Sequence, residues 1–151
     1  IKIQNGHKKG NIMIEIGNIR TLDPKFDGKQ YLIVRSLKNP VKYAEQMIEL
    51  SPSKSLFFDY LKWKKEGIWN EDTFKEKYMP RFLSEIKNNP KAIRELKNLI
   101  ELDKQGEKIK LVCFCTDANM CHRRIIASIL AENGANVITD SKLDNYQFII
   151  K

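Results

Sequence analysis

The chain has 151 residues, of which 42% are hydrophobic and 30% charged, and 27 Lys and Arg against 19 Asp and Glu give a net charge of +8. This length suits one compact domain, and the apolar fraction excludes a disordered or collagen-like chain. No apolar run approaches the roughly 18 residues that a membrane-spanning helix needs, so we expect no membrane partner. The positive charge favours an anionic small molecule or nucleic acid as partner.

The chain begins with a polar, basic segment, residues 1–11, which has no hydrophobic period. We expect it to be a flexible arm or a non-native remnant outside the fold, followed by a single α/β domain over residues 12–151. Alternating Ile12, Ile14 and Ile16 predict a first strand, and the apolar run 31–34 predicts a second. A turn-rich segment separates them.

A helical block is predicted over residues 51–106. The proline at position 80 is expected to kink its middle helix, and Gly106 is expected to end the last one. Three helix starts are predicted from capping residues and first-turn prolines, at Ser51-Pro52, Asn70 and Asn89-Pro90.

The C-terminal part alternates strands with one helix. Residues 109–114 are almost continuously apolar, which is typical of a strand buried on both faces. A helix is predicted from Cys121 to about Asn133, stopped by Gly134, and strands are predicted over 137–139 and 146–150. This order predicts a three-layer, Rossmann-like α/β domain with a mostly parallel sheet, an inserted helical block and an antiparallel C-terminal edge.

Chemistry-bearing residues concentrate in one strand-to-helix turn. All three cysteines, Cys113, Cys115 and Cys121, fall within nine residues, a spacing that favours a reducing, cytoplasmic location over a secreted disulfide scaffold. In α/β sheets, ligands bind beyond the carboxyl ends of the strands, where the next helix presents free backbone N–H groups. We therefore expect a binding site at this turn.

In the catalytic interpretation, Cys121 or His122 performs nucleophilic or proton-transfer chemistry, because the helix dipole and neighbouring cations favour the thiolate of Cys121. Arg123 is expected to hold a phosphate or carboxylate with its fork of N–H donors. We expect Arg35, Cys113 and Cys115 to line the ligand site beside it. No cofactor is predicted.

Other interpretations of the same residues remain open. Three thiolates and the imidazole of His122 are an acceptable zinc ligand set, but the single-residue spacing between Cys113 and Cys115 on a predicted strand argues against it, so no metal is predicted. Cys113 is also interpretable as a small buried apolar residue and His122 as a core histidine with its hydrogen bonds satisfied. Arg124 is interpretable as a solvated surface charge.

Cys113 followed by Cys121-His122-Arg123 at a helix start resembles the signature of domain-of-unknown-function family 488. Three further stretches resemble the family: Tyr31 to Arg35, Leu50 to Ser53, and Trp69 to Tyr78. The resemblance spans about residues 12–134. It implies a small α/β domain with a polar pocket, and it assigns no reaction. We expect a bacterial or phage protein.

The chain departs from the family pattern at several positions. Val34 stands where the family has Asp, Leu37 and Lys38 stand near its Trp-Pro-Arg, and Cys115 replaces a frequent Glu. If those acidic groups transfer protons in relatives, this chain lacks that step. Arg35 is retained, and the resemblance puts it at the carboxyl end of a second strand.

The leading hypothesis is an anion-binding site, made by Arg35, Cys121, His122 and Arg123, that acts on a nucleotide, nucleoside or nucleic-acid end; whether the protein is an enzyme stays open. One alternative is a zinc-stabilised structural domain. The other is a non-catalytic nucleic-acid-binding module, with cations of the helical block around Trp63 and Trp69: Lys62, Lys64, Lys65, Lys75, Lys77 and Arg81.

Overall fold

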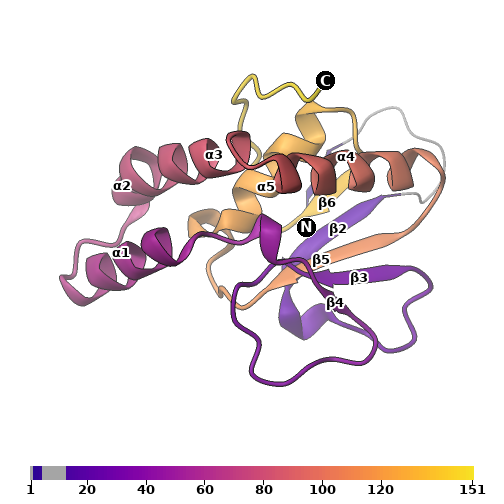
Figure 1. The fold of residues 1–151 in the computed structure, drawn as a ribbon, viewed down its shortest axis with the longest axis horizontal. Coiled ribbons are helices and arrows are strands. Elements are labelled where there is room, and N and C mark those ends of the chain that lie inside the picture. Colours follow the sequence, from indigo (N-terminus) through magenta and orange to yellow (C-terminus); the bar gives the residue numbers. More distant parts are fainter. Residues whose placement is uncertain (1, 5–12) are drawn as a thin grey trace.

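The computed structural model describes residues 2–4 and 13–151, in which one six-stranded sheet has the order β1-β6-β2-β5-β3-β4 (Figure 1). Five neighbouring strands are mutually parallel, and β1 pairs antiparallel with β6. The strands are β1 Lys2–Gln4, β2 Ile14–Asn18, β3 Lys29–Leu32, β4 Glu45–Gln46, β5 Ile109–Cys113 and β6 Val137–Thr139. The predicted Rossmann-like α/β fold with a mostly parallel sheet is confirmed.

The central strand β5 explains why the sequence 109–113 is so apolar. All five of its residues are buried, and it lies between β2 and β3. Even Lys110 is buried, because its ammonium donates to the Thr21 carbonyl at 2.6 Å and lies 4.7 Å from the centre of the Phe26 ring. The segment around Thr21 and Phe26 therefore covers one face of the sheet, while α5 packs on the other side, where Cys113 points.

Helices form where capping residues predicted them, with one shift. Asn70 and Asn89 accept hydrogen bonds from the backbone at the predicted starts. The first helix instead begins after Ser53, whose hydroxyl accepts from the Leu56 N–H, so the predicted cap at Ser51 is wrong. The α-helices are α1 Lys54–Lys65, α2 Glu71–Thr73, α3 Met79–Lys87, α4 Pro90–Lys104 and α5 His122–Glu132.

Short helical segments complete the chain. A π-helical turn, η3 Phe74–Tyr78, precedes α3, so the irregularity lies before Pro80 and leaves that proline in the first turn of α3. Gly106 and Gly134 follow α4 and α5 with positive φ, as predicted for the ends of these helices. The 3₁₀ turns are η1 Ile19–Thr21, η2 Ile48–Leu50 and η4 Ala118–Met120.

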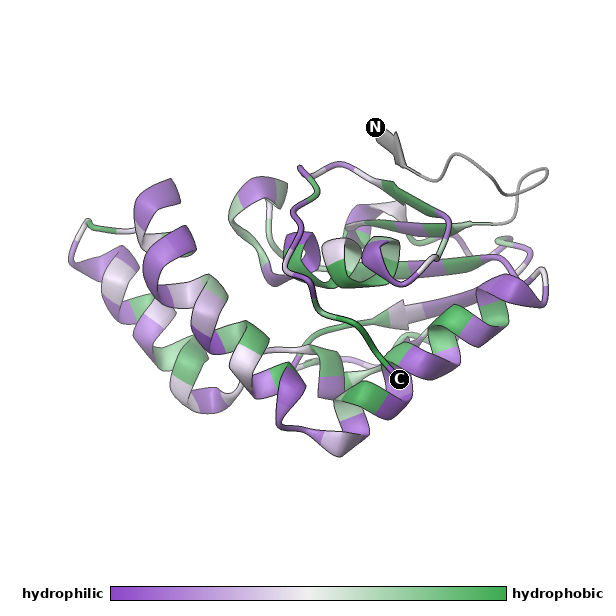
Figure 2. Ribbon diagram, turned by 90° about the horizontal axis from the view of Figure 1, so that it is seen from above, coloured by the Kyte–Doolittle hydropathy of each residue, from purple (hydrophilic) through white to green (hydrophobic). Residues whose placement is uncertain are grey.

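The helical block, α1 to α4, connects β4 to β5, and α5 connects β5 to β6. In Figure 1, α1 and α2 lie to the left of the strands, and α3 and α4 lead the chain back to β5. Green and purple residues alternate along these helices in Figure 2, as expected for elements that pack one face and expose the other. The α3 helix contacts α5, which brings the block next to the strand-to-helix turn.

The C-terminal end of the chain differs from prediction, and the predicted N-terminal arm is described only over Lys2–Gln4. Lys2–Gln4 pairs with β6, although we expected residues 1–11 to stay outside the fold; residues 1 and 5–12 lie outside the described part. The strand predicted over 146–150 is wrong. Its backbone binds side chains at the end of α5 instead: Asn133 donates to the Phe148 carbonyl and accepts from the Ile150 N–H, both at 2.8 Å.

Within the described part of the chain, every helix is too short or too polar to cross a lipid bilayer.

Candidate functional site

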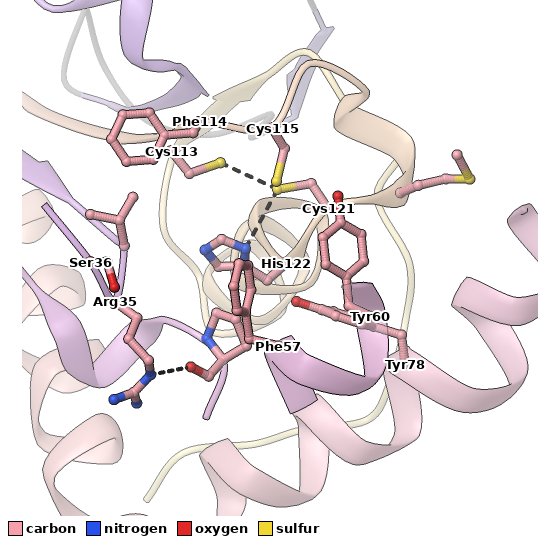
Figure 3. Close-up of a pocket in the computed structure, with 13 residues that line it drawn as sticks. Arg35, Ser36, Phe57, Tyr60, Tyr78, Cys113, Phe114, Cys115, Cys121 and His122 are labelled. Atoms are coloured by element: carbon pink, nitrogen blue, oxygen red, sulfur yellow. Dashed lines mark hydrogen bonds between the residues drawn. The ribbon is translucent and has the colours of Figure 1, made fainter. Parts of the chain in front are cut away.

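A cavity of about 250 Å³ opens where the carboxyl ends of β3 and β5 meet the N-terminal ends of α1 and α5 (Figure 3). Its lining is mostly apolar, with four aromatic rings, three cysteines and one histidine. The lining residues are Val34, Arg35, Ser36, Pro52, Phe57, Tyr60, Tyr78, Cys113, Phe114, Cys115, Met120, Cys121 and His122. The predicted site at the strand-to-helix turn is therefore part of a real pocket.

The three sulfur atoms and the His122 ring form one cluster, and their potential ligand atoms all lie within 4.8 Å of one another. The Sγ atoms of Cys113 and Cys121 are 3.2 Å apart, and Cys121 Sγ lies 3.5 Å from His122 Nδ1. Cys113 ends β5, Cys115 lies in the following loop, and Cys121 is the N-cap of α5. Strand end, loop and helix start thus bring four side chains to one point.

The tautomer of His122 follows from its contacts. Its Nε2 lies 2.7 Å from the Ile33 carbonyl oxygen, which can only accept, so Nε2 carries the proton. In the neutral ring, Nδ1 then has a free lone pair, and it faces Cys121. Phe82 packs edge-on against the ring at a centroid distance of 5.6 Å. His122 is thus a buried residue with one satisfied nitrogen and one nitrogen directed at the sulfurs.

Burial and hydrogen bonds within the cluster shift the pKa values of its three thiols in different directions. Hydrogen bonds from Cys115 and Cys121, together with the nearby His122 and Arg123, hold the pKa of Cys113 well below its usual value. Donation to Cys113 raises the pKa of Cys115 to about 12. Burial raises the pKa of Cys121, against the prediction that Cys121 carries the thiolate.

Arg123 reaches the cluster but does not line the cavity, and it is 1% exposed. Its guanidinium donates to Cys113 Sγ at 3.3 Å, to the Cys115 carbonyl at 2.6 Å, and to Asp140 at 3.0 and 3.3 Å. The fork of donors predicted to hold a ligand carboxylate therefore holds a carboxylate of the protein. Burial alone would lower the pKa of Arg123, but hydrogen bonds to Asp140 and Cys113 raise it.

Arg124 is not a solvated surface charge, because it is also 1% exposed. It donates to both carboxylate oxygens of Asp144, at 2.8 and 3.0 Å, and lies over the Phe74 ring at 5.4 Å. Tyr146 donates to the same carboxylate at 2.8 Å. Burial alone would raise the pKa of Asp144, but the bonds from Arg124 and Tyr146 outweigh it and lower that pKa.

This ion pair predicts a pH dependence of stability. Since the pKa of Asp144 is lower in the folded than in the unfolded chain, ionised Asp144 stabilises the fold above the unfolded value of about 3.9. That contribution is lost as the pH falls through the folded-state pKa. Asp144→Asn is therefore expected to cost stability at pH 7 and progressively less below about pH 4. Urea unfolding across this range measures it.

The control for that experiment is Asp27→Asn, since Asp27 is exposed in the turn before β3. It should leave the pH profile of the wild-type chain unchanged. A constant difference between the wild type and Asp144→Asn at every pH would contradict the assigned role of this carboxylate.

Arg35 lines the cavity, as predicted, but its charged end turns away from the sulfurs. Its Nε donates to the Pro52 carbonyl at 2.7 Å, and Figure 3 shows the guanidinium on the far side from the cysteines. Arg35 and Arg123 therefore do not converge on one ligand position. The structure brings together Cys113, Cys115, Cys121 and His122, and it separates the two arginines.

Several residues of the site were missed from sequence. Asn18, at the end of β2, donates to the Cys115 carbonyl at 2.9 Å and so holds the loop. Asp140, directly after β6, holds Arg123. A polar residue at the carboxyl end of a parallel strand was the available sign for both. The aromatic walls Phe57, Tyr60 and Tyr78 had no such sign, because their period predicted only core packing.

The basic surface of the helical block differs from the arrangement expected for base stacking. Its lysines are exposed, but Trp63 and Trp69 are half-buried and stack on each other, with ring centroids 6.1 Å apart and planes 2° apart. Arg81 forms an ion pair with Asp59. The tryptophans therefore offer less free ring surface than the nucleic-acid hypothesis assumed.

Comparison with protein-family models matches residues 14–134 to DUF488-N3a, described as the active DUF488-N3 subclade. The chain belongs to domain-of-unknown-function family 488. The resemblance read from the Cys-His-Arg element is thus confirmed, and the matched range runs from β2 to the glycine after α5. Neither a curated protein nor a solved structure matches this family 488 chain.

Proposed function

We propose that this family 488 protein binds a nucleoside or nucleotide in the cavity, with the base between the aromatic walls and the sulfur cluster beneath it. The observation that carries the proposal is the cavity itself, in which Phe57, Tyr60 and Phe114 surround a floor of thiols at the carboxyl ends of parallel strands. Ligands of open α/β sheets bind at this edge.

The lining favours a flat, uncharged ring at the floor over a phosphate. A purine or pyrimidine ring stacks on aromatic side chains for about 1 to 3 kcal/mol per base. The volume of about 250 Å³ is just below the usual range of ligand pockets, about 300 to 1,000 Å³, and suits one ring system with its sugar outside. Arg35 at the rim and the net charge of +8 would attract the phosphate of a nucleotide.

The floor would supply the reacting groups. Cys113, Cys121 and His122 line it and Cys115 is partly exposed, so the floor places thiol and imidazole groups beside the bound ring. Arg123 would act as a positioning residue, since it holds Cys113 and the loop from behind. The description of the subclade as active supports an enzymatic role.

Thermal unfolding with a panel of nucleobases, nucleosides and nucleotides tests the proposal. A panel member at one hundred times its dissociation constant should stabilise the wild type by about 2.7 kcal/mol. Phe57→Ala should weaken that ligand about tenfold, because one base–aromatic stack is lost. Phe58→Ala is the matched control: Phe58 is the next residue of α1, is 66% exposed, and does not line the cavity.

The proposal fails if no panel member stabilises the wild type. It also fails if a stabilising ligand binds the Phe57→Ala and Phe58→Ala variants equally well. Steeply salt-dependent binding of nucleic acid that survives Phe57→Ala would instead support the alternative of a basic, non-catalytic module on the helical block.

A further inference from the structure

The floor of the cavity has the composition of a metal site. Cys113, Cys115, Cys121 and His122 offer three sulfurs and one imidazole nitrogen within 4.8 Å of one another. A tetrahedral zinc ion, with bonds of about 2.3 Å to sulfur and 2.0 Å to nitrogen, holds its ligand atoms about 3.5 to 3.8 Å apart. The pairs at 3.2 and 3.5 Å are already close to that spacing, and the other pairs, none wider than 4.8 Å, need to shorten by about 1 Å at most.

The histidine is oriented as a metal ligand. Its Nε2–H donates to the Ile33 carbonyl at 2.7 Å, which fixes the tautomer and directs the Nδ1 lone pair to the sulfurs. Metal-binding histidines use this arrangement, with the second ring nitrogen donating to a carbonyl or carboxylate. Phe82 packs on the ring and limits its rotation.

The surrounding charges fit a zinc ion with three thiolates. Such a centre carries a net charge of −1, because the ion supplies +2. The guanidinium of Arg123 lies 3.3 Å from Cys113 Sγ and donates to it, and Asp140 shares this buried arginine. A backbone N–H at the start of α5, that of Arg123, also points at Cys121 Sγ at 3.5 Å.

The spacing argument against zinc does not hold in the structure. It assumed that Cys113 and Cys115 lie on one regular strand, with both side chains restricted by its pleat. The strand β5 ends at Cys113, so Cys115 lies in the loop and turns back toward the other sulfurs (Figure 3). Asn18 holds that loop by its hydrogen bond to the Cys115 carbonyl.

We propose that Cys113, Cys115, Cys121 and His122 bind one zinc ion, which fastens the end of β5 to the start of α5 and forms the floor of the cavity. Three of the four ligands are buried and Cys115 is partly exposed, so the ion exchanges through the Cys115 side. Bound zinc keeps the sulfurs as thiolates. Metal binding does not require a nucleoside, but a zinc ion held by these four side chains occupies the thiols at the floor, which then form its wall and do not react with the bound ring.

Elemental analysis of the reduced full chain, without an affinity tag and after dialysis against excess zinc, tests the site. We expect about one zinc per chain. Cobalt(II) in place of zinc should give the intense visible bands of tetrahedral thiolate coordination. Cys115→Ser, which changes the most exposed ligand, should lower zinc affinity by more than about tenfold in a chelator competition while the chain stays folded.

Asp117→Asn is the matched control, because Asp117 lies in the same loop, caps the Asn119 N–H and is outside the four ligands. It should retain zinc and the cobalt spectrum. Folded, reduced wild type without stoichiometric zinc, or a cobalt spectrum that Cys115→Ser leaves unchanged, overturns the site. Metal content is measured without any nucleoside, so failure of this site and failure of nucleoside binding are distinguishable.

Discussion

Replacing Arg123 with methionine is expected to lower the free energy of unfolding by about 3 to 5 kcal/mol. The side chain is 1% exposed and donates to Asp140, to Cys113 Sγ and to the Cys115 carbonyl. Methionine fills much of the volume but supplies none of these charged hydrogen bonds. The buried Cys113 Sγ is then left without its donor, which is the costly part of the loss, whereas Asp140 is 39% exposed and water can replace the guanidinium there. Urea unfolding at pH 7 measures the loss.

Two further variants separate charge from geometry. Arg123→Lys keeps the charge but lacks the planar fork, so it should recover only part of the loss. Arg20→Met changes an exposed arginine after β2 and should cost less than about 0.5 kcal/mol. If Arg123→Met costs no more than Arg20→Met, the network around Arg123 does not stabilise the fold.

Phe82→Ala is expected to cost about 3 to 5 kcal/mol as well, by a different mechanism. Phe82 has 0% exposure and lies between Tyr78, at a centroid distance of 6.2 Å, and His122 at 5.6 Å. Removing its ring leaves a cavity between α3 and α5, and close-packed interiors refill such a space only in part. The unfolding free energy from denaturant titration measures the effect.

Phe58→Ala is the control for that loss, because the same ring is removed from a position that is 66% exposed. It should change stability by less than about 0.5 kcal/mol. Phe82→Leu should recover most of the stability, since it refills most of the volume. A loss in Phe82→Ala as small as in Phe58→Ala would show that this ring is not part of the packed core.

Local patterns predicted most elements because they depend on neighbouring residues. Asn70 and Asn89 cap α2 and α4 in the structure, and Gly106 and Gly134 follow the ends of α4 and α5. The apolar run at 109–113 is a fully buried strand. Each of these depends on backbone hydrogen bonds or side-chain periods within a few positions. The same patterns gave a wrong prediction over residues 146–150. There the side chains of Glu132 and Asn133, at the end of α5, form hydrogen bonds with the backbone groups that would otherwise pair in a strand.

The candidate site stays a prediction, and the turn that carries it lines the cavity in the structure. The turn from β5 to α5 carries the cysteines and His122, as the strand-to-helix order predicted. The roles of Arg123 and Arg124 were not predictable, because their partners Asp140 and Asp144 lie 17 and 20 positions along the chain. From sequence alone, two adjacent arginines at a helix start are equally compatible with ligand contacts, surface charges and buried ion pairs.

The amino-acid order alone determined the α/β architecture, the position of the Cys-His-Arg element at a helix start, and membership of family 488. Those properties come from periodicity, capping and contiguous motif residues, all of which are local. Only the tertiary structure decided that Cys115 joins the other sulfurs, that Arg123 faces protein and not ligand, and that α1 supplies the aromatic wall of the cavity. These features depend on which distant segments meet, and packing of the whole chain sets that.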